Sequence, residues 1–469
     1  MNTTSVRVRF APSPTGFLHV GGLRTALFNY LWAKKNKGVF VLRIEDTDRA
    51  REVPGSVENI LEVFKTFDLK IDEGPVKQSD RLKIYQEHIQ ILLDKGAAYK
   101  CYCDEKRIEE LKKQADLAKV PFRYDKHCLK NPGGGDKFII RQNVPESGFT
   151  EFDDLVYEHI RVENRLLEDG VLVKSDGWPV YNFANVVDDH LMQISHVIRG
   201  QEFIPSTPKH ILLYQAFDWN VPQFVHLPLL LNKEKKKLSK RDGDVAVKEY
   251  LEKGYLPEAI LNFIAFLGWN PKTEQEIFSL DELVGAFDLL KINKAGAVFD
   301  LDKLQWFNAH YIKQKPLDEL MEMIKPYLGV DASKYPAEFL KNIVETERER
   351  LKMLSEIGER VQYFFQQPEY DTSLLCWKNV TNEEIKTSLQ EAEKIISSFQ
   401  LPISKNDIEK AFLEKIGTGD KGTMLWPLRV ALSGLKASPG PFEIISVFLK
   451  LPDGKEIIAQ RIQNAIAKL

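Results

Sequence analysis

The sequence predicts an α/β protein in two parts: a parallel β-sheet interrupted by an insertion, and an all-helical C-terminal half. Three observations predict this class. Residues 6–44 follow the order strand, loop, helix, strand, which is a βαβ unit and implies parallel strands. Residues 101–172 change to polar, charged and glycine-rich stretches. From residue 246 onward, apolar residues recur at helical spacing.

The first strands and helix have clear individual signals. Residues 6–10 alternate apolar and polar side chains, as in a half-buried strand. Residues 21–37 place apolar side chains at helical spacing, and Gly38 is a natural helix stop. Residues 39–44 are a short apolar run, which is typical of a buried strand.

The prediction of a helical C-terminal half is supported by one long pattern of apolar residues. Residues 339–365 place apolar side chains on roughly one face of a helix. This periodicity breaks near residues 367–369, where we expect a boundary. The other predicted elements are helices over 56–67 and 81–93, resumption of the sheet near residue 171, and strands over 193–198 and 225–231.

Size and composition exclude several classes of protein. A chain of 469 residues is expected to form more than one domain, and 43% hydrophobic with 28% charged residues is ordinary for a globular protein. The net charge of -3 means that any nucleic-acid contact must use local basic patches. No apolar run is long enough for a membrane span, and the N-terminus lacks the apolar core of a signal peptide. With only four cysteines, we expect a reducing, cytoplasmic setting.

Residues 12–22, PSPTGFLHVGG, link the first strand to the first helix. A helix N-terminus at the carboxyl end of a parallel strand offers free N–H groups to phosphates. Gly21 and Gly22 let a ligand approach the backbone, and His19 can donate hydrogen bonds to phosphate oxygens. The alternative is a Pro/Gly turn with a core histidine. The glycine spacing fits neither a dinucleotide fingerprint nor a P-loop.

A second informative segment, NKEKKKLSKR, covers residues 232–241. A basic loop can close over a triphosphate and stabilise charge in the transition state of nucleotidyl transfer. The alternative is a solvated basic surface. Together with residues 12–22, the segment indicates an ATP site that activates a carboxylic acid.

These motifs resemble those of a known family. APSPTGFLHVGG followed by RIEDTD is similar to the opening of glutamyl- and glutaminyl-tRNA synthetases, which are class I aminoacyl-tRNA synthetases, with HVGG where the class writes HIGH. KLSKR resembles the KMSKS motif, with Leu238 and Arg241 as the departures. The resemblance extends through residues 297–308 and 427–432 and covers essentially the whole chain. One further departure is residues 72–80, which are shorter than the glycine-rich stretch of relatives.

The resemblance implies a domain order. It implies a class I Rossmann-like parallel sheet with an inserted acceptor-binding domain, followed by all-helical stem-contact and anticodon-binding domains. A helical anticodon region is typical of bacterial-type glutamyl enzymes, whereas glutaminyl enzymes carry β-barrels. The expected ranges are catalytic 1–100 and 171–245, insertion 101–170, stem-contact 246–320, and anticodon-binding 321–368 and 369–469.

The implied activity is glutamate–tRNA ligation. ATP with Mg2+ would activate L-glutamate, which is then transferred to the 3′ end of tRNA(Glu) by a cytoplasmic monomer. Two alternatives stay open: an enzyme that also charges tRNA(Gln) with glutamate, and a catalytically silent tRNA-binding paralogue. Intact His19, Glu45, Arg199 and Lys240 argue against the silent paralogue.

The resemblance also implies roles for individual residues. Arginine suits the substrate carboxylates because its fork binds both oxygens. Arg9 with Tyr181 would hold the side-chain carboxylate, Glu45 the amino group and Arg199 a carboxylate. Arg350 or Arg348 would face the third anticodon base. The predicted sets are catalytic His19, Lys237 and Lys240; ATP-binding Pro12, Thr15, Gly16, His19, Gly21, Gly22 and Lys240; and glutamate-binding Arg9, Ala11, Ser13, Glu45, Tyr181, Asn185 and Arg199.

A separate cluster contains Cys101, Cys103, Tyr124 and Cys128. Thiolates at this density bind zinc in tetrahedral sites, and His127 is an alternative fourth ligand. The spacing resembles the zinc site found in part of the family. The alternative is that the cysteines are reduced, buried and metal-free.

Overall fold

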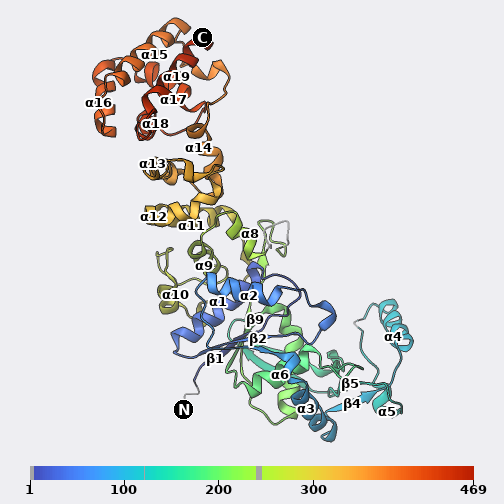
Figure 1. Cartoon of the computed structure of the whole chain (residues 1–469). Coiled ribbons are helices and arrows are strands. Elements are labelled where there is room, and N and C mark those ends of the chain that lie inside the picture. Colours follow the sequence, from blue (N-terminus) through green and yellow to red (C-terminus); the bar gives the residue numbers. More distant parts are fainter. Residues whose placement is uncertain (1–4, 121, 239–245) are drawn as a thin grey trace. The chain divides into compact units, whose positions relative to one another are not determined.

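The computed structural model describes residues 5–120, 122–238 and 246–469, and the chain divides into two compact units (Figure 1). The first unit comprises Met1–Tyr250 and Pro257–Lys303, and the second comprises Leu251–Leu256 and Leu304–Leu469. In the described part of the chain, no helix is long and apolar enough to cross a membrane.

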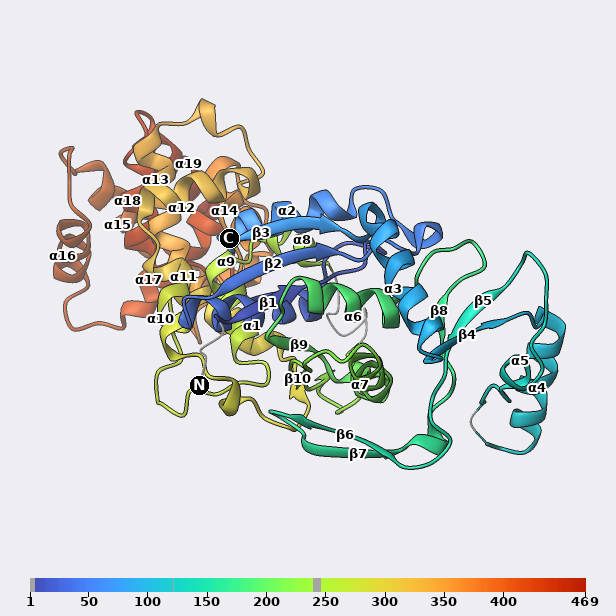
Figure 2. The same cartoon turned by 90° about the horizontal axis from the view of Figure 1, so that it is seen from below.

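A parallel sheet forms the centre of the first unit. Strands β1 (Arg7–Phe10), β2 (Val39–Ile44) and β3 (Glu73–Lys77) pair in parallel in the order β1-β2-β3. Strands β9 (His196–Gly200) and β10 (Gln223–Leu227) pair in parallel in a second sheet. The two sheets meet at β1 and β9 (Figure 2). There the Ser195 N–H, just before β9, donates to the Arg7 carbonyl at 2.9 Å. The predicted parallel sheet is therefore confirmed.

Helix α1 (Val20–Lys35) has His19 as its N-cap residue and ends two residues before the predicted limit. The His19 Nδ1 caps the helix by accepting the Gly22 N–H at 3.3 Å. The chain reverses through Lys37, which has a positive φ of 50°, into β2. A Cβ at Gly38 would lie 2.1 Å from the Val6 carbonyl oxygen, so only glycine lets this turn pack against β1.

Other helices of the first unit agree with the sequence pattern. The predicted helices over 56–67 and 81–93 are α2 (Ser56–Thr66) and α3 (Leu82–Asp94). The remaining helices named here are α6 (Tyr181–Leu191), α7 (Thr207–Ala216), α9 (Pro257–Ala265) and α10 (Leu280–Ala286). Helix α8 (Val247–Glu252) and helix α11 (Leu301–Gln314) each contain a boundary between the units. Strands β11 (Leu230–Leu231) and β12 (Ala297–Val298) form a small parallel pair.

The prediction that the sheet resumes near residue 171 is wrong. Strand β8 (Val171–Val173) pairs antiparallel with β5 (Ile139–Gln142), which pairs with β4 (Ala98–Cys101) in a separate three-stranded sheet. Helices α4 (Glu105–Leu117) and α5 (His127–Lys130) lie between β4 and β5 in the chain. The sequence of a short apolar strand does not indicate which strand it pairs with, because pairing is decided by packing against residues distant in the chain.

Two strands from within residues 101–172 instead extend the sheet of β9 and β10. Strand β6 (Phe149–Asp154) pairs in parallel with β10, and β7 (Glu158–Glu163) pairs antiparallel with β6. The burial of β6 alternates along the strand, with Thr150, Phe152 and Asp154 inside. This alternation places Asp154 on the inner face of the sheet, near β9 and β10.

The described part of the second unit is helical, as predicted. Residues 339–365, however, form two helices instead of one continuous helix, because the backbone leaves helical geometry at Leu351 and the Leu354 N–H donates to the Gly254 carbonyl at 3.2 Å. A Cβ at Gly254 would lie 2.6 Å from the Leu354 Cβ, so this close contact requires glycine. The helices are α12 (Leu317–Ile324), α13 (Ala337–Glu347), α14 (Ile357–Phe365), α15 (Asn382–Ser397), α16 (Lys405–Ile416), α17 (Lys421–Ser433), α18 (Pro441–Phe448) and α19 (Gly454–Lys468).

Candidate active site

A cavity of about 530 Å3 opens beside the carboxyl ends of β1, β2 and β9. Such ends are where open α/β sheets bind ligands. The cavity collects predicted residues that lie up to 228 positions apart in the chain. These are Arg9, Ala11, Ser13, His19, Gly21, Gly22, Glu45, Tyr181, Arg199 and Lys237.

A second cavity of about 330 Å3 shares Ser13, Glu45 and Tyr181 with the first. Thr15 lines this second cavity. Asn185 is buried one turn beyond Tyr181 on α6 and lines neither cavity. Pro12 and Gly16 also lie outside both linings, but the Pro12 carbonyl accepts the Glu45 N–H at 2.9 Å and so ties the 12–16 loop to the end of β2.

The two ends of the lysine-rich segment are held at the cavity. The Leu238 N–H donates to the Leu230 carbonyl at 2.8 Å, and Ala246 forms a β-bridge with His19. Lys237 lines the cavity and is exposed. The predicted residue Lys240 lies outside the described residues, as do the neighbouring positions of the KLSKR motif from residue 239 onward.

His19 combines an exposed ring with a defined orientation. Its Nδ1 accepts the Gly22 N–H, so a neutral ring carries its proton on Nε2. Nε2 is therefore the nitrogen that can donate to a ligand at the N-terminus of α1. This geometry suits hydrogen bonding to an anionic group such as a phosphate.

A buried network of charges lies beneath Glu45. The Arg43 guanidinium donates to Asp189 at 2.8 Å and to Glu45 at 3.3 Å. Arg9 donates to both oxygens of Asp189, at 2.9 and 3.3 Å. Arg43 is fully buried, and the carboxylates around it offset the cost of burying its charge.

The shortened segment 72–80 is tied to this network. It forms β3 and then a turn in which Gln78 donates to Asp188 at 2.8 Å. Ser79 donates through its N–H and its hydroxyl to Asp46, both at 2.7 Å. Asp188 also accepts from Arg81 at 2.8 Å. The segment therefore holds in place Asp46, which follows Glu45 in the chain, and Asp188, which lies 3.8 Å from Arg43.

Arg199 is held by side chains from three elements. Its Nε donates to the His226 Nε2 on β10 at 3.2 Å, and its Nη1 donates to the Tyr181 hydroxyl on α6 at 3.2 Å. Its Nη2 donates to the Thr207 hydroxyl on α7 at 2.8 Å. Only 5% of Arg199 is exposed, yet it lines the cavity, so its charge is directed at any ligand there.

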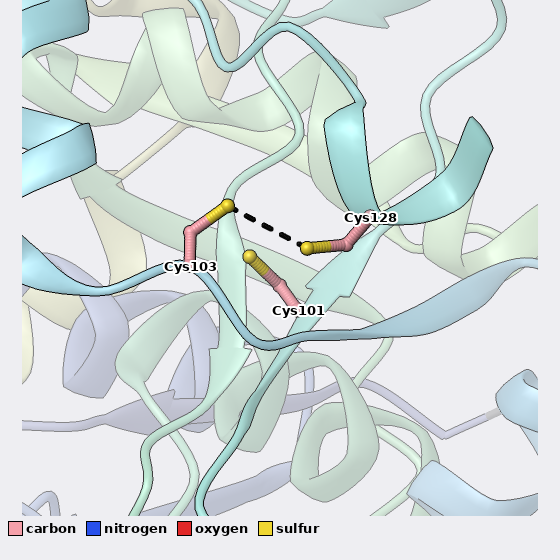
Figure 3. A group of neighbouring side chains, drawn as sticks. All are labelled: Cys101, Cys103 and Cys128. Carbon is pink, nitrogen blue, oxygen red and sulfur yellow. Dashed lines mark hydrogen bonds between the residues drawn. The ribbon is translucent and has the colours of Figure 1, made fainter. Parts of the chain in front are cut away.

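The three cysteine thiols of the separate cluster point toward one another (Figure 3). Their sulfur atoms all lie within 4.8 Å of one another. The Tyr124 hydroxyl lies 3.3 Å from the Cys101 sulfur and 3.2 Å from the Cys103 sulfur. His127 is exposed and is not among the mutually close ligand atoms. Three mutually close sulfurs with a neighbouring phenol oxygen are a donor set that could hold a zinc ion.

Sequence reasoning missed the groups behind the cavity: Arg43, Asp188, Asp189, Asp154 and His226. Two of them carried a signal. Arg43 interrupts the apolar strand VFVLRI, and His226 interrupts the apolar strand QFVHL. A polar side chain in a strand that is otherwise apolar is expected to be buried and therefore to need a buried hydrogen-bond or ionic partner. Such a position is a signal for a buried polar network.

Comparison with known proteins identifies the family. A family model described as tRNA synthetases class I (E and Q), catalytic domain, matches residues 5–306. The glutamate–tRNA ligase of Clostridium kluyveri is 46% identical to this chain, over 99% of this chain and 98% of the relative. The chain belongs to the glutamate–tRNA ligase family. The predicted resemblance and class of enzyme are therefore confirmed.

Further members of this family are similar to this chain over nearly its full length. The glutamate–tRNA ligase of Alkaliphilus metalliredigens is 43% identical, over 98% of each chain. The crystal structure of a glutamate tRNA ligase from Elizabethkingia meningosepticum in complex with its amino acid has a TM-score of 0.87 and 34% identity, covering 99% of this chain and 100% of that one. A model described as anticodon binding domain matches residues 319–466. As a member of the glutamate–tRNA ligase family, the chain is an aminoacyl-tRNA ligase.

The site makes a testable prediction about pH. Burial raises the pKa of Glu45 to about 7, although Arg43 and Arg9 oppose this shift, and Asp189 adds to it. In the role predicted for it from the sequence, Glu45 holds the substrate ammonium group, which requires the carboxylate form. A carboxyl with this pKa loses most of its negative charge between pH 8 and pH 6. We expect the KM for glutamate to rise about tenfold over this range in steady-state aminoacylation.

The Glu45→Gln variant is the control for this pH dependence. Its KM for glutamate is expected to be higher at pH 8, because the negative charge is gone, but to change little between pH 8 and pH 6. The KM for ATP of the native enzyme serves as a second control, since Glu45 is not assigned to ATP. An equally steep pH dependence in Glu45→Gln would show that another group is responsible.

Proposed function

We propose that the 530 Å3 cavity binds ATP and L-glutamate and joins them as glutamyl-adenylate before the glutamyl group passes to tRNA(Glu). The observation that carries this proposal is the convergence of two buried arginines, Arg9 and Arg199, with one buried carboxylate, Glu45. Glutamate has two carboxylates and one ammonium group, so its charges are complementary to this set. Arg9 with Tyr181 would hold the side-chain carboxylate, with Ala11, Ser13 and Asn185 at the same wall, and Arg199 would hold the other carboxylate.

The phosphates of ATP are proposed to lie at the N-terminus of α1. Gly21 and Gly22 line the cavity at this point, and the His19 Nε2 and the Lys237 and Lys240 ammonium groups would stabilise the negative charge of the transition state. Mg2+ bound together with ATP would neutralise part of the charge of the phosphates. The glutamate carboxylate attacks the α-phosphorus in line and pyrophosphate leaves. Catalysis is by positioning and charge, without a protein nucleophile.

The tRNA is proposed to contact several parts of the chain. The match of residues 319–466 to an anticodon-binding domain supports anticodon recognition by the predicted domains 321–368 and 369–469. Residues 101–170 would meet the acceptor end, and residues 246–320 the stem. Arg350, whose Nη1 lies 3.6 Å from the Glu347 carboxylate, is proposed to face the third anticodon base. The enzyme is proposed to act as a monomer in the cytoplasm, together with its tRNA.

Aminoacylation with purified tRNA(Glu) and tRNA(Gln), using labelled glutamate and labelled glutamine, tests this function. We expect glutamate to be attached to tRNA(Glu), and no glutamine to be attached to either tRNA. Attachment of glutamate to tRNA(Gln) as well would identify an enzyme with relaxed tRNA choice. Attachment of glutamine, or no aminoacylation at all despite tRNA binding, would contradict the proposal.

We also propose that Cys101, Cys103, Cys128 and Tyr124 hold one structural zinc ion. The distances between the three sulfurs and the phenol oxygen support this ligand set over one that includes His127. Zinc would link β4 and the residues after it to α5 and the segment before α5, and so stiffen the proposed acceptor-binding region.

Elemental analysis of protein purified without chelator is expected to find about one zinc ion per chain. Cys128→Ser should lose the metal and lower the thermal stability of the protein, because the remaining ligands no longer close the site. Cys376→Ser is the matched control, since Cys376 is exposed and lies outside the cluster. Metal-free native protein with unchanged stability would contradict the zinc site.

A further inference from the structure

Behind Arg199, a chain of buried polar groups leads away from the cavity. The His226 Nε2 accepts from the Arg199 Nε at 3.2 Å, and the other ring nitrogen of His226 lies 2.7 Å from the Asp154 carboxylate. The side chains of His226 and Asp154 are completely buried. They come from β10 and from β6, so neither is near Arg199 in the sequence.

The direction of each hydrogen bond follows from Arg199. A guanidinium can only donate, so the His226 Nε2 must be the acceptor and the proton of a neutral ring must lie on Nδ1. The Nδ1–H then donates to Asp154. The same oxygen of Asp154 accepts the His226 N–H at 3.0 Å, and the other oxygen accepts the N–H groups of Val156 and Tyr157 at 2.9 and 2.8 Å. Asp154 is therefore an acceptor in all four contacts, as a carboxylate must be.

A second histidine, His210, also accepts a hydrogen bond from Arg199. The His210 Nδ1 lies 3.2 Å from the Arg199 Nη2 and must also accept, so its Nε2–H donates to the Asn182 side-chain oxygen at 2.9 Å. Burial lowers the pKa of both His210 and His226, although Asp154 opposes the shift of His226. Both rings are therefore neutral near neutral pH and place no second cation against Arg199.

These contacts use four of the five N–H donors of Arg199: one reaches His226, one Tyr181, and two reach Thr207 and His210. Among the contacts of the described residues, the second N–H of Nη1 has no protein acceptor. Because the Tyr181 oxygen accepts from Nη1, the Tyr181 hydroxyl hydrogen points away from Arg199. The second Nη1–H and the Tyr181 O–H are thus two neighbouring donors at the cavity, each available to the substrate carboxylate to which its residue is assigned.

We propose that Asp154 and His226 are positioning residues for glutamate. Asp154 keeps the His226 proton on Nδ1, so that the His226 Nε2 remains a hydrogen-bond acceptor for Arg199. This contact holds the donor groups of Arg199 and Tyr181 toward the cavity. This inference rests on the proposed role of Arg199 in binding a glutamate carboxylate. Neither residue touches the substrate, and both act through Arg199.

The Asp154→Asn variant tests the proton position. An asparagine N–H facing His226 favours the other tautomer, which places an Nε2–H against the Arg199 Nε–H. We expect the KM for glutamate to rise about tenfold, with kcat and the KM for ATP changed less than about twofold. In 15N NMR of histidine-labelled enzyme, the His226 proton is expected to move from Nδ1 to Nε2.

A pair of variants at His226 separates positioning from packing. In His226→Gln the amide oxygen can replace the Nε2 acceptor, and we expect a KM for glutamate within about threefold of native. His226→Leu fills similar space without an acceptor and is expected to raise this KM about tenfold. Thermal unfolding of each variant verifies that it is folded. If Asp154→Asn does not fold, the comparison of His226→Gln with His226→Leu still tests the proposal.

The results distinguish failure of this inference from failure of the proposed function. Equal KM values for glutamate in His226→Gln and His226→Leu, or parallel changes in every kinetic constant, would overturn the positioning role. If Arg199→Ala raises the KM for glutamate while His226→Leu does not, only the positioning role fails. If Arg199→Ala leaves that KM unchanged, the proposed role of Arg199 fails, and the positioning role fails with it.

Discussion

Arg199→Ala is expected to raise the KM for glutamate roughly 30- to 4,000-fold, with a much smaller effect on the KM for ATP. Removing one partner of a buried, hydrogen-bonded charge pair costs about 2–5 kcal/mol, and each 1.4 kcal/mol is about tenfold in affinity. Arg199 meets this condition because it is 95% buried and lines the cavity. Steady-state aminoacylation with varied glutamate, at saturating ATP and tRNA, measures the effect.

Arg161→Ala is the matched control for Arg199→Ala. Arg161 lies on β7 with its guanidinium 2.8 Å from the Glu151 carboxylate, and its side chain is 55% exposed. Such a surface pair contributes about 0–1 kcal/mol, so we expect an unchanged KM for glutamate and nearly unchanged stability. A native KM for glutamate in Arg199→Ala would remove this residue from the glutamate site.

Arg43→Met is expected to have the largest effect on stability, lowering the free energy of unfolding by about 3–5 kcal/mol. Methionine fills much of the same volume, but it leaves the buried Glu45 without its direct ion pair and takes one of two arginines from Asp189. Urea unfolding, followed by tryptophan fluorescence, measures the change. Because Glu45 also loses its orientation, the KM for glutamate should rise together with the loss of stability.

Arg51→Met is the control for Arg43→Met. Arg51 lies 3.9 Å from Asp48, and its side chain is 71% exposed, so solvent screens the pair. We expect a change in unfolding free energy below about 1 kcal/mol. If both variants unfold at the same urea concentration as the native protein, the charges beneath Glu45 do not stabilise the fold.

Local patterns predicted the elements whose signals lie within a few residues. The spacing of apolar side chains and the glycine at position 38 located α1 to within two residues at its C-terminus. The same reasoning failed for β8 and for residues 339–365. In both cases the deciding contact is distant in the chain: β5 for β8, and the Gly254 carbonyl for Leu354. A pattern of apolar residues shows that a segment is buried, but not against what.

The candidate site also contains residues that local motifs predicted and residues that they did not predict. Arg9, Glu45, Tyr181 and Arg199 were predicted from motifs, and the structure brings all four to one cavity, while their individual roles stay predictions. The charges that hold them were not predicted. Asp189 binds Arg9 from 180 positions away, and no motif relates the two residues.

The sequence by itself determined the family, the class of reaction and the types of residue that line the cavity, because those residues lie in short motifs whose order is preserved along the chain. Only the tertiary structure decided which charges are paired, which arginines are buried and which nitrogen of His226 faces Arg199. The physical reason is that hydrogen bonds and buried ion pairs depend on separations of about 3 Å and on exclusion of water. These quantities arise when β1, β6, β9 and β10 come together, and they have no local counterpart in the sequence.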